Sequence, residues 1–370
     1  MIQGFVTQEG TKRYSSRFPE AIASRYFWER DNLFLPCIGL GTYLGEMDEK
    51  TDEALYQAAK QCLESGVNVV DSAINYRAQR SERVIGKVIR DMLQAGSLRR
   101  DEVFISTKGG FIPFDGYYPQ DLDRYLADTY LTPGILNPDD VVEGCHAITP
   151  RFLEHSLSQS LSNLGVETID LYYVHNPETQ LEAMGEAQVY ERLTRAFELL
   201  EAETAQGRIL SYGTATWNGY RVSQKTKGYL SLAKVLEAAQ RAGGRAHHFK
   251  AIQLPYNLGM PEAFTNQNQL WDAELISPIA WAARAGLAVF TSASLLQGRL
   301  AQQMPKKISS LFPECSSPAA CALQFVRSTP GVTTALVGMK SRAHVGEDLV
   351  VRTIPRLSEE AFSNLFLSVP

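Results

Sequence analysis

The chain lacks the features that mark several large classes of protein. It has no extended run of basic residues and a net charge of −5, so a nucleic-acid-binding role is not supported. Its five cysteines are scattered and show no spacing typical of metal ligands, which predicts no metal site and favours reduced thiols in a cytoplasmic protein. No stretch approaches the roughly 18 apolar residues of a membrane span. The first residues do not follow the basic-then-apolar order of a signal peptide, so we expect neither a span nor a leader.

Short apolar runs and amphipathic segments alternate along the 370 residues. Runs with strand character lie at 36–42, 67–71, 102–108, 169–175, 209–213, 251–255, 287–291 and 334–338. Segments with helical spacing lie at 52–65, from an N-cap at Ser81 through Met92, at 149–164, 186–206, 230–241, 270–285 and 318–328, and from about 342. Eight parallel strands could form an open sheet, but closure at eight favours a (β/α)8 barrel, the TIM barrel. We expect one barrel domain over residues 1–370.

Two segments do not follow this alternation. Residues 1–35 are rich in aromatic residues and predict an N-terminal hairpin and extension that cap the barrel. Residues 109–148 form an insertion with many aromatic residues after the third strand, so they belong with the long loops of the C-terminal face. Loops of this length are often lids or binding loops. The insertion is therefore interpreted either as a lid on a substrate pocket or as a small satellite core.

Four polar residues lie at or just after strand ends. Asp71, Lys108 and His175 end the second, third and fourth strands, and Tyr76 follows Asp71 by five residues. Taken singly, three of them have ordinary explanations: a helix cap for Asp71, packing for Tyr76, a satisfied loop residue for His175. Since strand ends of a barrel converge on one mouth, their joint occurrence predicts one site.

These side chains are suited to handling a proton on a carbonyl oxygen. We expect Lys108 to lower the pKa of Tyr76 from its usual value of about 10. Asp71 would hold Lys108 in place. Tyr76 could then protonate the oxygen while His175 orients it. No side chain can deliver a hydride to the carbon, so a nicotinamide cofactor is implied.

Seven segments, in order, resemble the aldo-keto reductase family. They are IGLGTY at 38–43, DSAINY at 71–76, SERVIG at 81–86, FISTK at 104–108, IDLYYVH at 169–175, QLPYN at 253–257 and PAACAL at 318–323. The resemblance, to a divergent member with a long loop after the third strand, implies a (β/α)8 barrel, NADP(H) and reversible reduction of aldehydes or ketones. It makes Asp71, Tyr76, Lys108 and His175 a catalytic tetrad, with Tyr76 as the general acid.

The same resemblance implies a set of cofactor contacts. They are Gly41, Thr42, Tyr43, Asp71, Thr216, Gln253, Ser292, Leu295, Gln297, Gly338, Lys340, Ser341, Arg342, His344, Glu347 and Asp348. A cationic helix start at Lys340 to Arg342 suits a 2′-phosphate and favours NADP over NAD, although both cations could be solvated loop charges. The glycines at 39, 41 and 45 have the spacing GxGxxxG, which does not match the Rossmann dinucleotide fingerprint.

Three positions depart from the family pattern. Ala215 and Thr216 stand where a Ser-Asn pair is usual, and Ser292 stands where an aromatic side chain usually stacks on the nicotinamide. Tyr43, Trp217 and Trp271 are candidate walls of the substrate pocket. The departures keep two alternatives to a carbonyl reductase open: a cofactor-binding sensor or interaction protein similar to potassium-channel β-subunits, and a sugar or alcohol dehydrogenase working in the oxidative direction. The sequence predicts neither the substrate nor the oligomeric state.

Overall fold

Eight parallel strands close into a barrel, which confirms the predicted fold. The computed structural model describes residues 1–367. The barrel order is β11-β12-β3-β4-β5-β6-β7-β8, closed by pairing of β8 with β11. The strands are β3 Ile38–Gly41, β4 Val69–Asp71, β5 Phe104–Gly109, β6 Leu171–His175, β7 Tyr212–Ala215, β8 Phe249–Pro255, β11 Ala288–Ser292 and β12 Thr334–Val337.

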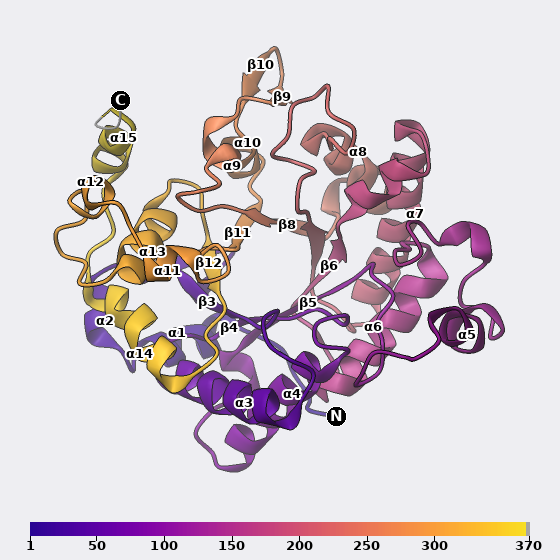
Figure 1. The fold of residues 1–370 in the computed structure, drawn as a ribbon, viewed down its shortest axis with the longest axis horizontal. Helices are drawn as coiled ribbons and strands as arrows, with labels where there is room; N and C mark the ends of the chain where they lie inside the picture. Colours follow the sequence, from indigo (N-terminus) through magenta and orange to yellow (C-terminus); the bar gives the residue numbers. More distant parts are fainter. Residues whose placement is uncertain (368–370) are drawn as a thin grey trace.

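Helices surround the barrel in a ring (Figure 1). Those of the alternating pattern are α3 Glu49–Glu64, α4 Arg80–Gln94, α6 Pro150–Leu164, α7 Glu186–Ala205, α8 Leu232–Gly243, α10 Pro278–Arg284, α13 Pro318–Ser328 and α14 Arg342–Asp348. Short additional helices are α5 Leu122–Leu126, α9 Glu262–Thr265, α11 Arg299–Gln302, α12 Lys306–Ser309 and α15 Glu359–Leu367. The ring covers the outer face of the strands, so both faces are buried and the strand sequences are almost continuously apolar.

Aromatic side chains fill the interior of the barrel. The rings of Phe104 and Phe290 stack with centroids 5.8 Å apart, and Tyr173 meets Phe290 edge-on at 6.4 Å. The interior is therefore a packed core, and the polar residues at the strand ends are left at the mouth above it.

The N-terminal segment packs against the opposite end of the barrel. It contains α1 Gln8–Ser15, α2 Pro19–Ala23 and an antiparallel hairpin of β1 Phe27–Arg30 and β2 Leu33–Pro36. Both turn residues, Asp31 and Asn32, have positive φ, as tight two-residue hairpins require. Val6 and Leu35 share a buried cluster with the barrel residue Leu171, so this end of the barrel is covered by apolar side chains. The two helices were not predicted.

The single helix predicted at 270–285 is wrong. The segment forms a hairpin, β9 Gln269–Trp271 and β10 Glu274–Ile276, and only then α10, and Figure 1 shows this hairpin projecting from the ring. The reason is local: Pro278 disfavours helix in the residue before it, and Ser277 caps α10 by accepting a hydrogen bond from the Ala280 amide. Trp271 packs on Trp281 with centroids 5.2 Å apart and does not reach the barrel mouth.

The predicted N-cap at Ser81 is also wrong. The N-cap of α4 is Gln79, which has a left-handed φ of 69°, and Ser81 lies inside the first turn. The Ser81 hydroxyl instead donates to the Thr42 carbonyl oxygen at 2.8 Å. This bond ties the start of α4 to the loop after β3, one of the loops of the mouth.

The insertion 109–148 builds a satellite core of its own. It includes α5, a π-helical turn at Ala127–Leu131 and a 3-10 turn at Pro138–Asp140. Tyr130 and Leu136 pack with Phe152 of α6, and Tyr125 and Tyr130 both donate to the Pro113 carbonyl oxygen at 3.0 Å. Figure 1 shows α5 at the outer edge of the helix ring. Tyr125 and Tyr130 thus follow the second interpretation of the insertion, the satellite core, whereas Tyr117 and Tyr118 are exposed.

Candidate functional site

A cavity of about 770 Å³ opens at the C-terminal ends of the barrel strands. Of the predicted site residues, the following line it: Gly41, Thr42, Tyr43, Asp71, Tyr76, His175, Thr216, Trp217, Gln253, Ser292, Leu295, Gln297, Gly338, Lys340, His344, Glu347 and Asp348. Lys108 is completely buried beneath the floor, and Ser341 and Arg342 are not part of the lining. The volume lies within the usual range for small-molecule sites, about 300–1,000 Å³.

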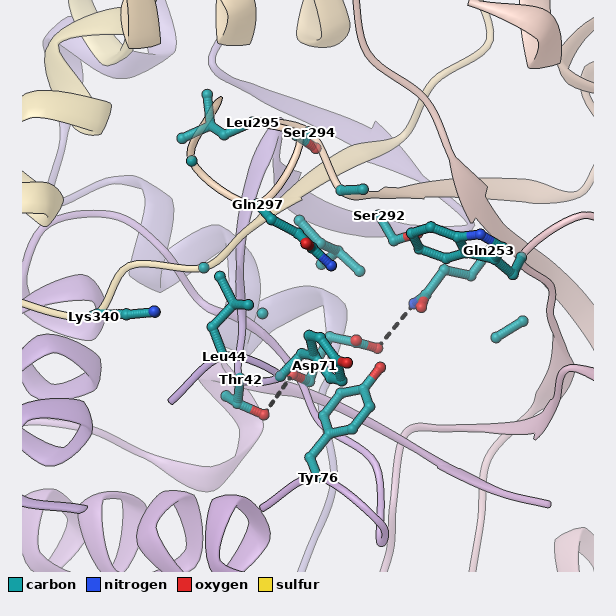
Figure 2. A pocket seen from close by; sticks show the side chains of 18 of the residues that line it. Thr42, Leu44, Asp71, Tyr76, Gln253, Ser292, Ser294, Leu295, Gln297 and Lys340 are labelled. Atoms are coloured by element: carbon teal, nitrogen blue, oxygen red, sulfur yellow. Dashed lines mark hydrogen bonds between the residues drawn. The ribbon is translucent and has the colours of Figure 1, made fainter. Parts of the chain in front are cut away.

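Asp71 is the hydrogen-bond acceptor at the floor of the cavity. Its Oδ2 atom accepts from the Lys108 ammonium at 2.5 Å. Its Oδ1 atom accepts from the Ser106 hydroxyl at 2.8 Å and from the Gln253 amide at 3.0 Å, the second of which is drawn in Figure 2. Strands β4, β5 and β8 thus converge on one buried carboxylate. Lys108 also donates to the Ser72 carbonyl oxygen at 2.6 Å. Burial alone would lower the pKa of Lys108, but Asp71 and Tyr76 outweigh it, so the pKa is raised and Lys108 is charged.

Tyr76 stands beside this ion pair with its hydroxyl group directed into the cavity (Figure 2). The Lys108 Nζ atom lies 4.8 Å from the centroid of the Tyr76 ring. Burial raises the pKa of Tyr76, and the lowering by Lys108 does not compensate for it. The net direction is opposite to the one that we expected from Lys108 alone. Tyr76 is therefore a phenol at neutral pH, and Lys108 is placed to stabilise the phenolate when the proton leaves.

His175 completes the group at the end of β6. Burial, together with the nearby Lys108 charge, holds its pKa well below the usual range, so the imidazole is neutral. Its Nδ1 atom is buried and has no hydrogen-bond partner within residues 1–367. The ring meets that of Tyr76 with centroids 6.0 Å apart. The structure thus brings together a protonated phenol, a buried ammonium and a neutral imidazole.

Three aromatic side chains form the wall around Tyr76 and His175. Tyr43 meets Tyr76 edge-on at 5.1 Å, and Phe111 meets His175 at 5.1 Å. Trp217 lies in the loop after β7 and keeps 43% of its surface exposed. Phe111 is the one aromatic residue of the insertion that lines the cavity.

A buried carboxylate holds the loop that carries Trp217. The Oε1 atom of Glu178 accepts hydrogen bonds from the amides of Trp217, Asn218 and Gly219 at 2.7, 3.0 and 3.3 Å. Arg221 also donates to the Trp217 carbonyl oxygen at 2.9 Å. The backbone of the loop is therefore fixed, although the indole projects into an open space.

The unusual residues on β7 and β11 lie next to Gln253. The Thr216 amide donates to the Gln253 carbonyl oxygen at 2.8 Å, and the Thr216 hydroxyl is buried without a partner in the described chain. Ser292 ends β11 beside it, and Figure 2 shows Ser294, Leu295 and Gln297 on the loop that follows. The cavity wall here offers a free hydroxyl and an amide side chain, and no aromatic ring at position 292.

The side of the cavity that faces Gln253 carries charged residues. Lys340 lies across the cavity from Gln253 in Figure 2 and forms no ion pair with any residue from 1 to 367. Ser341 caps α14 by accepting from the His344 amide at 3.3 Å, and Arg342 donates to Gln61 at 3.2 Å. Of the three residues predicted to hold a phosphate, only Lys340 faces the cavity.

Asp348 lies at the same side and is almost completely buried. Burial, followed by the neighbouring charge of Glu347, raises the pKa of Asp348 to about 7. A raised carboxyl pKa means that the folded state resists ionisation, whereas the unfolded chain ionises near pH 4. Stability is therefore lost as the pH rises from about 4 to about 7.

Replacing the Asp348 carboxyl with an amide removes the loss of stability that its ionisation causes. We expect the stability advantage of Asp348→Asn over the unaltered protein to grow by about 2–3 kcal/mol between pH 5 and pH 8, measured by urea unfolding. Glu347→Gln, a change at the exposed neighbour, should show a much smaller growth. Equal pH dependence of Asp348→Asn and the unaltered protein would contradict the assignment.

Several cavity residues were not predicted. They are Leu44, Asn75, Phe111, Asn176, Ala293, Ser294, Gly298, Ala301, Gln302 and Leu336. Asn75 and Asn176 adjoin Tyr76 and His175, so their position in the sequence could have indicated them. The residues at 298–302 carried no signal, since α11 follows no pattern that distinguishes it from a surface turn.

Residues 1–367 contain neither a membrane-spanning helix nor a cluster of metal ligands. The described helices include none long and apolar enough to cross a membrane. Nor does this part of the chain bring three or more His, Cys, Asp or Glu side chains together as metal ligands.

Comparison with known proteins supplies the family. A family model described as "Aldo/keto reductase family" matches residues 37–241, more than half of the chain. Prostaglandin F synthase 1 of Bos taurus is 28% identical over 147 residues, which are 40% of this chain and 33% of that protein. The chain thus aligns with about a third of the length of the first of its curated relatives. A probable voltage-gated potassium channel subunit beta of Oryza sativa subsp. japonica is 24% identical over 339 residues, 88% of this chain and 89% of the relative.

Solved structures share the barrel. An aldo/keto reductase from Klebsiella pneumoniae in complex with NADP and acetate superposes with a TM-score of 0.60 at 20% identity, covering 92% of this chain and 94% of the other. The holo form of an aldo-keto reductase from Bacillus halodurans gives 0.61 at 17% identity, covering 94% and 96%. Identities this low establish a common fold and no more.

Proposed function

The chain belongs to the aldo/keto reductase family, and we propose that it is an NADPH-dependent oxidoreductase that reduces an aldehyde or ketone to an alcohol. The observation that carries the proposal is the grouping of three side chains at the cavity floor. Lys108 is held by Asp71 at 2.5 Å, its Nζ atom lies 4.8 Å from the Tyr76 ring centroid, and the Tyr76 and His175 rings are 6.0 Å apart. The directions of their pKa shifts favour a protonated Tyr76, a charged Lys108 and a neutral His175. This combination suits donation of one proton to an oxygen on which negative charge develops.

The cavity wall fits a nicotinamide dinucleotide. The buried Thr216 hydroxyl lacks a partner in the part of the chain that the structure describes, and Thr216 and Gln253 both line the cavity. Together they could bind a carboxamide. At the other side, Lys340 is a cation without a counter-charge among the described residues, as a phosphate would require. Gly41 and Gly338 line the cavity between these ends and let a ligand approach the backbone.

The residues of this chain would then act in a defined order. When bound, the reduced nicotinamide supplies the hydride for the carbonyl carbon. His175 donates a hydrogen bond to the carbonyl oxygen and fixes its direction; because Nδ1 is buried, we assign this role to Nε2. The Tyr76 hydroxyl releases its proton to the same oxygen. Lys108 stabilises the phenolate that remains, and Asp71 keeps Lys108 charged and in place.

Lys340 is proposed to select NADPH over NADH. Removal of this cation by Lys340→Ala should weaken NADPH binding about tenfold and leave NADH binding unchanged, since only NADPH carries the additional phosphate. Calorimetric titration with both cofactors measures this. Lys234→Ala, which removes an exposed lysine of α8, is the matched control. Similar dissociation constants of the unaltered protein for the two cofactors would refute the preference.

A second candidate function is a cofactor-binding sensor or interaction protein with little turnover. It is favoured by the channel-subunit relative, whose alignment extends over 88% of the chain. The weaker hold on a nicotinamide at Ala215 and Ser292 is compatible with it. Alcohol or sugar oxidation at the same site differs only in direction.

Turnover distinguishes these functions. NADPH oxidation is followed by the loss of the absorbance of the reduced nicotinamide, with aromatic, aliphatic and sugar aldehydes as substrates. NADP reduction is followed in the same way with the matching alcohols. Reduction of at least one carbonyl compound supports the proposal. Tight NADPH binding without turnover in either direction would refute it and favour the sensor.

A further inference from the structure

His175 is held from behind by a buried hydrogen-bonded chain that the proposed chemistry does not use. The Nε2 atom of His146, in the insertion, lies 2.7 Å from the His175 carbonyl oxygen. The Nδ1 atom of His146 lies 2.8 Å from the Gln180 Nε2 atom. The Gln180 Oε1 atom accepts from the Arg192 guanidinium, on α7, at 2.7 Å. His146 and Gln180 are completely buried, and Arg192 is half-buried.

The groups at the two ends, the Arg192 guanidinium and the His175 carbonyl oxygen, fix the position of each proton in the hydrogen bonds between them. A guanidinium can only donate, so the Gln180 atom that faces Arg192 is the oxygen, and its NH2 group faces His146. The Nδ1 atom of His146 must therefore accept. A neutral imidazole carries one proton, which is then on Nε2, and the His175 carbonyl oxygen can only accept it. Burial lowers the pKa of His146 to about 4, in agreement with a neutral ring.

The contact is made on the β5 side of His175, since on the other side its backbone pairs with Ala215 of β7. The last residue pair between β5 and β6 joins Gly109 to Val174, so His175 lies beyond it. The next residue, Asn176, has a left-handed φ of 45°, which is strained for a residue with a side chain. Gly110, with a φ of +151°, lies so close that a Cβ atom there would come within 2.6 Å of the His175 carbonyl oxygen. The imidazole of His146 thus bonds a carbonyl group at a sharp change of chain direction.

We propose that His146, Gln180 and Arg192 form a relay that positions His175, with Arg192 fixing the tautomer of His146. The proposal deepens the proposed function, because it gives the insertion a task at the same site: support of the neutral imidazole that orients the substrate oxygen. None of the three residues lines the cavity, so they are positioning residues. Arg192 also lies 3.4 Å from the Asp139 carbonyl oxygen, which joins α7 to the insertion a second time.

The test uses substitutions of Arg192, the member farthest along the chain of bonds from His175. Arg192→Met removes the donor, so the Gln180 amide can turn over and His146 loses its unique tautomer. We expect kcat to fall about tenfold with KM changed less than about twofold, since a small displacement of an orienting group acts on the reacting geometry. Arg192→Lys, which can still donate to Gln180, should recover most of the loss. Arg195→Met, on the same helix but exposed, should leave kcat unchanged. Rates are normalised to the number of NADPH-binding sites.

A readout without turnover keeps this inference separate from the proposed function. In protein with 15N-labelled histidine, His146 should show an unprotonated Nδ1 and a protonated Nε2 by NMR. In Arg192→Met that pattern should be lost and the ring resonances of His175 should shift, with neither change in Arg195→Met. A protonated Nδ1 in the unaltered protein, or unchanged His175 resonances in Arg192→Met, would overturn the relay. Absence of carbonyl reduction in the unaltered protein would refute the proposed function and not this result.

Discussion

Tyr76→Phe is expected to lower kcat by about a thousandfold while the dissociation constant for NADPH stays nearly the same. The substitution removes one oxygen atom and keeps the ring, so the contacts of Tyr76 with Tyr43 and His175 remain. The oxygen is the group that would release the proton, and no other phenol among the described residues lines the cavity floor beside Lys108. Steady-state rates together with cofactor titration separate loss of chemistry from loss of binding.

The matched control is Tyr125→Phe. Tyr125 also loses a hydroxyl that is hydrogen-bonded, in this case to the Pro113 carbonyl oxygen, but it lies in the satellite core of the insertion. We expect a small loss of stability and an unchanged kcat. If Tyr76→Phe retained the full rate, another group would have to supply the proton, and the assignment of Tyr76 as the acid would be wrong.

The sequence predicted what depends on local patterns. The helix at 318–328 was predicted at its observed bounds, because Ser317 caps it by accepting from the Ala320 amide and Pro318 occupies its first turn. The barrel and the family followed from the order of apolar runs and the residues at their ends. The fifth strand was placed about three residues early, because Ile209 is apolar and buried but forms only an isolated bridge with Ile169.

What escaped prediction depends on contacts between distant segments. The pKa of Tyr76 is raised because the side chain is buried, and the spacing of residues in the sequence does not predict this burial. No pattern in the sequence indicated His146, which is buried against the His175 carbonyl group, 29 positions away. The aromatic content of the insertion is compatible both with a lid and with a satellite core. The packing of Tyr130 against Phe152 of α6 shows that part of the insertion forms the core.

Breaking the ion pair at the cavity floor should damage both stability and catalysis. Asp71→Asn is expected to lower the free energy of unfolding by about 3–5 kcal/mol, because Lys108 would remain completely buried without a counter-charge. We also expect kcat to fall at least about tenfold, since Lys108 would no longer be held against Tyr76. Lys108→Met should show losses of the same order. The double variant should lose less stability than the sum of the two, because neither residue is then left charged and alone.

A second buried ion pair provides the control for stability. Arg100 and Asp170 meet at 2.9 Å at the other end of the barrel, where Asp170 also accepts from the Val6 and Ile105 amides. Asp170→Asn should therefore lower stability comparably and spare the kcat of the folded fraction. Loss of kcat in both variants would mean that Asp71→Asn acts through general destabilisation.

The pH dependence of unfolding identifies the charge that is responsible. The pKa of Lys108 is raised above its usual value of 10.5 in the folded protein, because Asp71 and Tyr76 outweigh burial. A raised lysine pKa stabilises the fold below the pKa of the unfolded chain, and this contribution is lost as the pH rises through the folded pKa. In Asp71→Asn, Lys108 is still buried but has lost the carboxylate that raised its pKa, so the pKa of Lys108 falls. The effect of pH then reverses: stability rises with pH. Urea unfolding at pH 7 and pH 9 should then show Asp71→Asn recovering part of its deficit at the higher pH. At pH 9 the folded variant can hold Lys108 neutral, and removing its proton on folding costs less as the pH approaches the pKa of the unfolded chain. Asp170→Asn should recover none.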